Sequence, residues 1–230
     1  MKQVERPSPN CDSRGGVPID MLLLHYTGMH DGEAALARLC DPTAKVSAHY
    51  MLDEDGTIYA LVPEQTRAWH AGVSFWAGAR DINARSIGIE LVNPGHEFDY
   101  RHFPDPQIAA LISLAQAILA RHAIPAWRVL GHSDVAPMRK TDPGELFPWE
   151  RLARAGIGLW PGMAADPGEG AVAALLAYFG YDPDALPNKN IIAFQRHFRP
   201  SRADGMADAE TRRLLAGLVA LYDARKGDAR

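Results

Sequence analysis

The apolar residues up to position 130 gather in short runs, separated by segments rich in polar and turn-forming residues. Short continuous apolar runs bounded by turn signals are typical of buried strands. They predict strands at 21–26, 48–52, 57–62, 86–92 and 128–130. The sequence Asp53-Glu54-Asp55-Gly56 joins the second and third of these and indicates a hairpin.

Two longer segments have the spacing of helices. Residues 32–39 predict a helix that Asp41-Pro42 ends, because the residue before a proline disfavours the helical conformation. Residues 106–122 repeat apolar side chains every three or four positions, with Pro106 in the first turn. Strands interspersed with helices indicate an α/β or α+β domain.

The pattern changes after Trp160-Pro161. Residues 162–170 are rich in Gly, Pro, Ala and Asp, which predicts a linker. Beyond it, helical spacing without intervening strands predicts a small all-α unit with helices at 171–180, 189–198 and 207–222. The sequence therefore predicts two domains, 1–161 and 171–230, joined by the linker.

Charge and composition narrow the possible functions. The 230 residues are 47% hydrophobic and 23% charged, as in ordinary soluble globular proteins, and the formal net charge is −4. Because no basic field is available to hold a phosphate backbone, nucleic acid is not an expected partner. The apolar run at 21–24 is far too short to span a bilayer, so no transmembrane segment is expected.

The polar N-terminal residues and the two cysteines bear on the compartment. The first sixteen residues lack the apolar segment of a secretory signal, which predicts a cytoplasmic protein. A periplasmic location is the alternative if an export signal has been removed. Cys11 and Cys40 favour reduced thiols, although a disulfide between them stays open. They cannot form a zinc ribbon, which needs closely spaced pairs.

Two of the nine histidines stand where strands end. His25 closes an apolar run and His132 follows Leu130-Gly131, and both positions open into loops, where sites are commonly built. Asp142 comes ten residues after His132. Two imidazoles and a carboxylate match a catalytic zinc site with an open fourth position. Such a set, spread over half of the chain, also occurs by chance in many sequences.

Most of the other histidines have less informative surroundings. The polar or turn-rich stretches around His30, His96, His102 and His197 favour surface positions. His122 ends an amphipathic helix, where a cation is favoured by the helix dipole.

Five local motifs, in order, add to this picture. They are LLLHYTG, VSAHYMLDEDGTIYALVPE, RAWHAG, NARSIGIELVN and GHSDVAPMRKTDPG. Together they resemble the type-2 N-acetylmuramoyl-L-alanine amidases, the family that includes the peptidoglycan recognition proteins and phage T7 lysozyme. The resemblance runs from about Pro9 to about Trp160 and is closest to the branch that cleaves 1,6-anhydro-muropeptides in cell-wall recycling.

The resemblance implies a central mixed β-sheet flanked by helices and one zinc ion per chain. The zinc ligands of the family fall on His25, His132 and Asp142, its catalytic glutamate on Glu90 and its catalytic lysine on Lys140. Positions at or beside its substrate groove fall on Lys45, Trp69, His70, Arg80 and Asn83. Another branch carries a tyrosine where this chain has Ala48, which argues for the glutamate-using branch.

The chemistry of amide hydrolysis agrees with these roles. Zinc polarises an amide carbonyl and lowers the pKa of water, and a carboxylate such as Glu90 can take the water's proton. A charged residue within an apolar strand is costly unless partnered; a strand-end Glu90 that faces solvent is the alternative. A cation such as Lys140 can stabilise the oxyanion, whereas the alternative is a surface lysine beside Arg139.

The C-terminal segment has a second, weaker resemblance. Residues 167–225 are similar to the three-helix peptidoglycan-binding module often attached to such amidases. The cues are Phe194-Gln195-Arg196, Asp204-Gly205 and Glu210-Thr211. Structural packing of these helices against the first domain is the alternative.

These expectations combine into one function and one rival. The expected reaction is hydrolysis of the amide between (1,6-anhydro-)N-acetylmuramic acid and L-alanine in muropeptides, during peptidoglycan turnover. The rival is a non-catalytic module that binds peptidoglycan without cutting it. The complete set of ligands, together with Glu90 and Lys140, favours the enzyme.

Overall fold

The computed structural model describes residues 2–228, and its centre is a six-stranded sheet. The strand order is β1 (Gln3–Glu5), β5 (Ile58–Ala60), β4 (Tyr50–Leu52), β7 (Ser86–Leu91), β3 (Met21–Tyr26) and β8 (Val129–Gly131). Strands β4, β7, β3 and β8 run parallel, whereas β5 is antiparallel to β4, so the sheet is mixed. A second, two-stranded sheet pairs β2 (Cys11–Ser13) with β6 (Thr66–Ala68). The predicted mixed α/β fold is confirmed.

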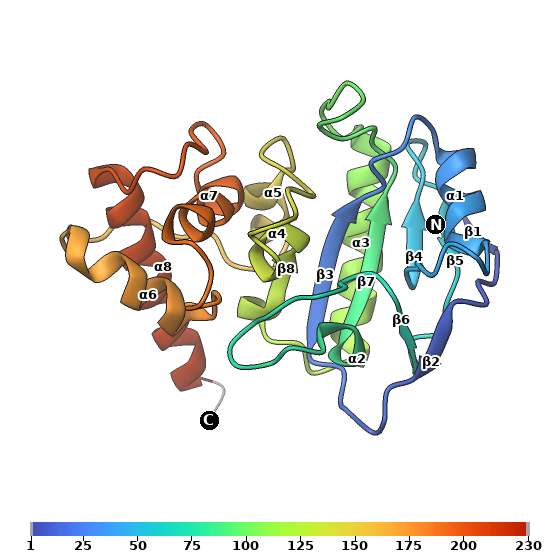
Figure 1. Ribbon diagram of the computed structural model, residues 1–230, viewed down its shortest axis with the longest axis horizontal. Coiled ribbons are helices and arrows are strands. Elements are labelled where there is room, and N and C mark those ends of the chain that lie inside the picture. Colours follow the sequence, from blue (N-terminus) through green and yellow to red (C-terminus); the bar gives the residue numbers. More distant parts are fainter. Residues whose placement is uncertain (1, 229–230) are drawn as a thin grey trace.

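Helices connect and cover the strands (Figure 1). In chain order they are α1 (Gly32–Cys40), α2 (Ile82–Arg85), α3 (Asp105–Arg121), α4 (His132–Val135), α5 (Trp149–Arg154), α6 (Val172–Phe179), α7 (Pro187–Phe198) and α8 (Ala209–Asp228). Two short 3₁₀ turns, η1 (Ala126–Arg128) and η2 (Glu169–Ala171), complete the set. Among the described residues, no helix combines the length and apolar character needed to cross a membrane.

The two faces of the central strands are buried by different partners. Leu22 and Leu24 of β3 belong to a buried cluster with residues of β7 and of α3, which lies behind the sheet in Figure 1. Met21 and Leu23 point to the other face and join a separate buried cluster. Burial on both faces explains why this strand is a continuous apolar run.

One face of β7 is not apolar. Ser86, Gly88 and Glu90 pair in register with Met21, Leu23 and His25 of β3. Because side chains directly opposite each other on neighbouring strands share a face, these small and polar residues lie beside His25. The sheet therefore leaves one face of β7 free for side chains that arrive from loops.

Helices α6, α7 and α8 gather at the β8 end of the molecule, drawn in orange and red in Figure 1. Leu176, Phe194 and Leu215 of these helices are buried in one cluster with Leu23 of β3 and Leu130 of β8. The three helices lie close to their predicted positions, and residues 161–168 before them contain no helix or strand. The C-terminal helices thus complete the hydrophobic core on one face of the sheet.

A buried carboxylate joins the C-terminal helices to α4. Asp134 accepts hydrogen bonds from the Tyr181 hydroxyl at 2.8 Å, from His197 Nδ1 at 2.7 Å and from the Gly131 amide at 2.7 Å. The His197 ring stacks on Trp149 with 3.7 Å between ring centroids. His197 is only 2% exposed, so the surface position expected for it is wrong. Its partner lies 63 residues away in sequence, beyond the reach of local pattern.

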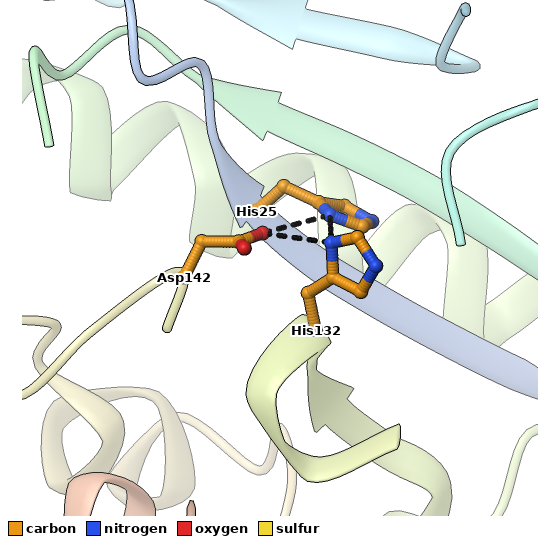
Figure 2. A group of neighbouring side chains, drawn as sticks. All are labelled: His25, His132 and Asp142. Carbon is orange, nitrogen blue, oxygen red and sulfur yellow. Dashed lines mark hydrogen bonds and ion pairs between the residues drawn. The ribbon is translucent and has the colours of Figure 1, made fainter. Parts of the chain in front are cut away.

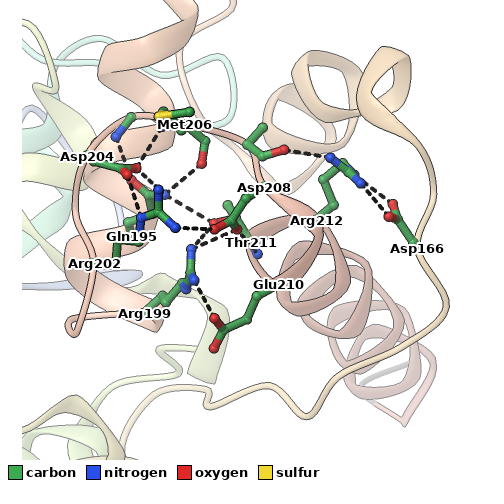
Figure 3. A network of polar contacts seen from close by, with 12 residues as sticks. Asp166, Gln195, Arg199, Arg202, Asp204, Met206, Asp208, Glu210, Thr211 and Arg212 are labelled. Atoms are coloured by element: carbon green, nitrogen blue, oxygen red, sulfur yellow. Dashed lines mark hydrogen bonds and ion pairs between the residues drawn. The ribbon is translucent and has the colours of Figure 1, made fainter.

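Several residues that gave the sequence cues of the C-terminal unit stabilise the turn within that unit (Figure 3). The Gln195 amide donates to the Thr211 hydroxyl at 3.1 Å and accepts from the Gly205 amide at 2.8 Å. Arg199 donates to Asp208 and to Thr211, both at 2.8 Å, and forms an ion pair with Glu210. These contacts fix the turn between α7 and α8, so the cues are explained by folding alone.

The Asp134–His197 contact generates a test of how strongly the two parts depend on each other. His197→Ala should lower the free energy of unfolding by about 3 kcal/mol, because it takes one donor from a buried carboxylate and empties a packed site. Denaturant unfolding measures the change. The matched control is Asp184→Asn, which breaks the exposed Arg80–Asp184 pair between the same two parts and should leave stability unchanged. Equal stability of His197→Ala and the native chain would contradict the assignment.

Candidate metal centre and active site

Three potential metal ligands meet at the carboxyl ends of parallel strands. His25 lies near the end of β3, His132 opens α4 directly after β8, and Asp142 lies in the loop beyond α4. Ligand sites of α/β sheets commonly form at this edge. Figure 2 shows the three side chains pointing at one another, although the sequence separates the outer two by 117 positions.

The spacing of the three ligand atoms suits a metal ion. His25 Nδ1 lies 3.0 Å from His132 Nδ1 and 3.0 Å from Asp142 Oδ2, and His132 Nδ1 lies 3.1 Å from the same oxygen. Bonds of about 2.0–2.1 Å to tetrahedral zinc place ligand atoms about 3.3 Å apart. All three side chains are buried. Three lone-pair atoms cannot satisfy one another without a cation or shared protons, so the donor set fits a metal.

The contacts of His132 Nε2, the nitrogen that faces away from the centre, indicate which of the two ring nitrogens carries the proton. Nε2 lies 3.0 Å from the Ala71 carbonyl oxygen, which can only accept a hydrogen bond. Arg139 Nη2 lies farther from the same nitrogen, at 3.3 Å. The shorter contact, to the carbonyl, places the proton on Nε2, and Nδ1 then presents its lone pair toward Asp142 and His25.

The charges at the centre favour cation binding. Burial, and then the neighbouring His132, lower the pKa of His25 to about 4, so the imidazole is neutral at neutral pH. Burial by itself would raise the pKa of Asp142, but His132 and His25 bring it well below its ordinary value. Two neutral nitrogens and one carboxylate are the forms that bind a divalent metal.

Backbone contacts bring the ligand loop to the strand end. The Ser133 amide donates to the Asp142 carbonyl at 2.9 Å, which joins the helix that carries His132 to the loop that carries Asp142. A Cβ on Gly131 would lie 2.8 Å from Pro143 Cδ. Only glycine therefore allows the loop that carries Asp142 to approach β8 this closely.

Glu90 lies beside the candidate metal centre. It is the β7 residue in register with His25 and shares its face of the sheet. One of its carboxylate oxygens is buried and has no hydrogen-bond partner among the described residues. Burial, and then the negative charge of Asp142, raise the pKa of Glu90 well above its usual value, while Lys140 opposes them. A carboxylate with a raised pKa is a stronger base than an exposed one, which suits it to take up a proton and pass it on.

A cavity of about 540 Å³ opens over this centre. Its lining includes Glu90, His132, Lys140 and Asp142 together with two of the expected substrate residues, Trp69 and His70. The sequence-predicted ligands, the glutamate and the lysine are thus brought together at one site.

The other three expected substrate residues lie elsewhere. Lys45 is exposed, and Lys45, Arg80 and Asn83 are not among the described residues that line the cavity. Arg80 pairs with Asp184 at 3.4 Å in an exposed position. Asn83 is buried, and its Oδ1 accepts from the amides of His70 and Ala71 at 3.0 and 2.8 Å. Asn83 therefore shapes the loop that carries His70.

Several lining residues were missed in the sequence. Arg38, His96, Glu97 and Arg139 also line the cavity. Arg139 donates from Nε to the Val73 carbonyl at 2.8 Å and also bonds to the Ala71 carbonyl, so it braces the loop against the metal centre. The position of Arg139 directly before Lys140 was the only sequence feature that pointed to it. Arg38, His96 and Glu97 lie in segments with no distinctive sequence pattern.

Comparison with known proteins identifies the family. A family model described as N-acetylmuramoyl-L-alanine amidase matches residues 15–145. The chain belongs to this family. The resemblance drawn from the sequence motifs is confirmed, and the amidase is a hydrolase, as expected.

Relatives and solved structures agree with this assignment. The amidase is 42% identical to the N-acetylmuramoyl-L-alanine amidase AmiD of Escherichia coli, over 89% of this chain and 83% of AmiD. It is 36% identical to the 1,6-anhydro-N-acetylmuramyl-L-alanine amidase AmpD of Enterobacter cloacae, over 64% of this chain and 86% of AmpD.

Two solved structures cover nearly the whole amidase. The complex of Escherichia coli AmiD with anhydro-N-acetylmuramic acid-L-Ala-D-γ-Glu-L-Lys has a TM-score of 0.81 at 40% identity and covers 92% of this chain and 93% of that one. AmpDh3 of Pseudomonas aeruginosa has a TM-score of 0.82 at 35% identity and covers 89% and 92%. Both therefore share the arrangement of the sheet and of the C-terminal helices.

The geometry of the three ligands predicts the effect of removing the carboxylate. Asp142→Ala should lose at least tenfold in affinity for a divalent metal, because two neutral nitrogens leave the ion's charge poorly compensated. Competition with a chromogenic chelator measures the affinity. Glu97→Gln, which removes another carboxylate from the same cavity, should bind metal as the native chain does. Equal affinity of Asp142→Ala and the native chain would exclude Asp142 as a ligand.

Proposed function

We propose that this amidase is zinc-dependent and hydrolyses the amide between (1,6-anhydro-)N-acetylmuramic acid and L-alanine in soluble muropeptides. The observation that carries the proposal is the buried triangle of His25, His132 and Asp142, with Glu90 in register beside it. The solved complexes of AmiD and AmpDh3 with anhydromuramic peptides support this substrate class.

The roles of the protein side chains follow from their positions. His25, His132 and Asp142 would hold a zinc ion, which would supply a Lewis acid to polarise the amide carbonyl and acidify water. Glu90 takes the proton of the attacking water and passes it to the departing amine of L-alanine, which its raised pKa allows. Lys140, which lines the same cavity, stabilises the negative charge that develops on the carbonyl oxygen.

The cavity also suits the acidic stem peptide of such a substrate. Besides Lys140, the cations Arg38 and Arg139 line it. Peptide carboxylates are attracted to such groups. Lys45, expected from the sequence to meet a carboxylate, is exposed outside the lining and stays a prediction.

The rival function is a module that binds muropeptides without cutting them. The convergence of the ligands, Glu90 and Lys140 favours the enzyme. Mass spectrometry of a purified anhydromuropeptide, incubated with the protein with and without a chelator, separates the two. Cleavage abolished by the chelator is expected, and binding without cleavage would establish the rival.

Substitution of Glu90 and Lys140 tests their separate roles. Glu90→Gln should lower kcat by about 10²–10⁴-fold with little change in KM, since the amide cannot accept the proton of water. Lys140→Ala should lower kcat by about 10²–10³-fold, because it removes a cation near the oxyanion. Steady-state kinetics on a muropeptide measures both.

Both variants need a metal measurement beside the rate. Neither residue is proposed as a ligand, so each variant should keep the metal content of the native chain. Near-normal turnover of Glu90→Gln with its metal retained would mean that another carboxylate is the base.

For the domains, we infer a catalytic part at 1–161, a connection at 162–170 and a peptidoglycan-binding-like module at 171–230. The buried cluster shared by α6, α7, α8 and the sheet supports a module that packs firmly on the catalytic part. Because its motif residues stabilise its own turn, the motif by itself does not indicate glycan binding.

We propose a cytoplasmic location, as the sequence predicts, with a periplasmic one as the alternative. Fractionation of the native host, with the protein detected by antibody, tests this. Recovery in the periplasm or on a membrane would contradict it.

A further inference from the structure

A second histidine lies directly behind the metal ligand of β3. His25 Nε2, the nitrogen that faces away from the metal centre, lies 3.1 Å from His70 Nδ1. The two rings meet edge to face, with centroids 5.1 Å apart. His70 Nε2 in turn lies 3.3 Å from the Ser86 hydroxyl, which lies 2.7 Å from the Ile82 carbonyl oxygen. Four groups thus form an unbroken chain from the metal centre to the main chain of α2.

The direction of every hydrogen bond in this chain follows from its far end. The Ile82 carbonyl can only accept, so the Ser86 hydroxyl donates its single proton there. The Ser86 oxygen must then accept from His70 Nε2–H. A neutral His70 consequently has its lone pair on Nδ1, where it accepts from His25 Nε2–H. His25 is left with a lone pair on Nδ1, the nitrogen that faces Asp142 and His132.

The strand beneath His70 is shaped to admit its ring. A Cβ on Gly88 would lie 2.5 Å from His70 Cγ and 2.6 Å from Nδ1. Any other residue at position 88 would therefore push the ring away from His25. On this face β7 carries no large apolar side chain: its residues there are Ser86, Gly88 and Glu90.

The main chain of His70 is also fixed. Its amide donates to Asn83 Oδ1 at 3.0 Å, and the next amide, of Ala71, donates to the same oxygen at 2.8 Å. Within the described chain, the two ring nitrogens of His70 have hydrogen-bond partners only in His25 and Ser86. His70 is buried to 9% exposure, so little of it is offered to a ligand in the cavity.

We propose that His70 is a positioning residue that, through Ser86 and the Ile82 carbonyl, fixes the tautomer and ring orientation of the metal ligand His25. The inference rests on the proposed metal centre and gives His70 a role other than the substrate contact expected from the sequence. A positioning role affects metal binding without substrate, whereas a substrate contact affects KM and leaves metal binding unchanged.

Three substitutions of His70 separate these roles. Asn places its side-chain oxygen where Nδ1 stands and keeps an acceptor for His25 Nε2–H. Gln reaches the place of Nε2 and Leu has no acceptor, so both lose that bond. Loss of such an outer hydrogen bond typically costs 10–100-fold in metal affinity. We expect His70→Leu and His70→Gln to weaken Zn²⁺ binding by this factor, and His70→Asn to stay within about threefold of the native chain.

The affinity is measured by competition with a chromogenic chelator in the absence of substrate. The matched control is His49→Leu, which removes another buried histidine from the same face, 5.7 Å from the His70 ring but with no contact to a ligand. It should destabilise the fold without changing Zn²⁺ affinity. If His70→Leu does not fold, Ser86→Ala carries the test, with an expected several-fold loss because it removes the hydroxyl that accepts from His70 Nε2–H.

Long-range ¹⁵N spectra of the histidine rings give a second readout. Both His25 and His70 should carry their proton on Nε2, and in Ser86→Ala the population of this tautomer should fall. Unchanged Zn²⁺ affinity in His70→Leu and His70→Gln with a raised KM would overturn the proposal. A native chain that binds no Zn²⁺ would instead refute the proposed function. The tautomers of His25 and His70 in the metal-free protein would then still show whether the chain of hydrogen bonds exists.

Discussion

The arrangement of this amidase depends on bringing three lone-pair atoms within about 3 Å of one another in a buried place. Without a cation this is unfavourable, because burial removes water from a carboxylate and two nitrogens that have too few protons to share. The surroundings are therefore organised to hold the atoms in place: parallel pairing aligns β3 with β8, and a backbone hydrogen bond joins Ser133 to Asp142. Each imidazole is held through its other nitrogen.

The same requirement explains the position of the C-terminal helices. Asp134 lies two residues after His132 on the single turn of α4, which is too short to be stable by itself. Tyr181 and His197 donate hydrogen bonds to its carboxylate from the C-terminal part, so that part braces the element that carries His132, a proposed metal ligand. The match to AmpD of Enterobacter cloacae covers 64% of this chain but 86% of AmpD, so the family also has shorter members. In this amidase the C-terminal helices form part of the core.

The sequence predicted the elements whose signal is local. The strand at 21–26 and the helix at 106–122 were found within one residue of their observed bounds, because continuous burial and helical periodicity are visible in any window of the chain. The three-residue strands β1, β2 and β6 were not predicted, since most of their residues are exposed or partly buried and have no pattern. The buried place of His197 and the pairing of Arg80 with Asp184 depend on partners far along the chain, which no local pattern reveals.

Strand β7 shows what a closer analysis of alternation could have found. Ile87, Ile89 and Leu91 face α3, and their alternate neighbours Ser86, Gly88 and Glu90 face the site. Taken together the six residues look like one apolar strand, but one of the two faces has no large apolar side chain. A buried face built in this way must be covered by something other than the strand's own side chains. Here His70 covers Gly88 and hydrogen-bonds to Ser86, and Glu90 is left to face the proposed metal centre. The absence of large apolar side chains from one face of a buried strand therefore indicates that side chains from a loop cover that face, and that a functional site can lie there.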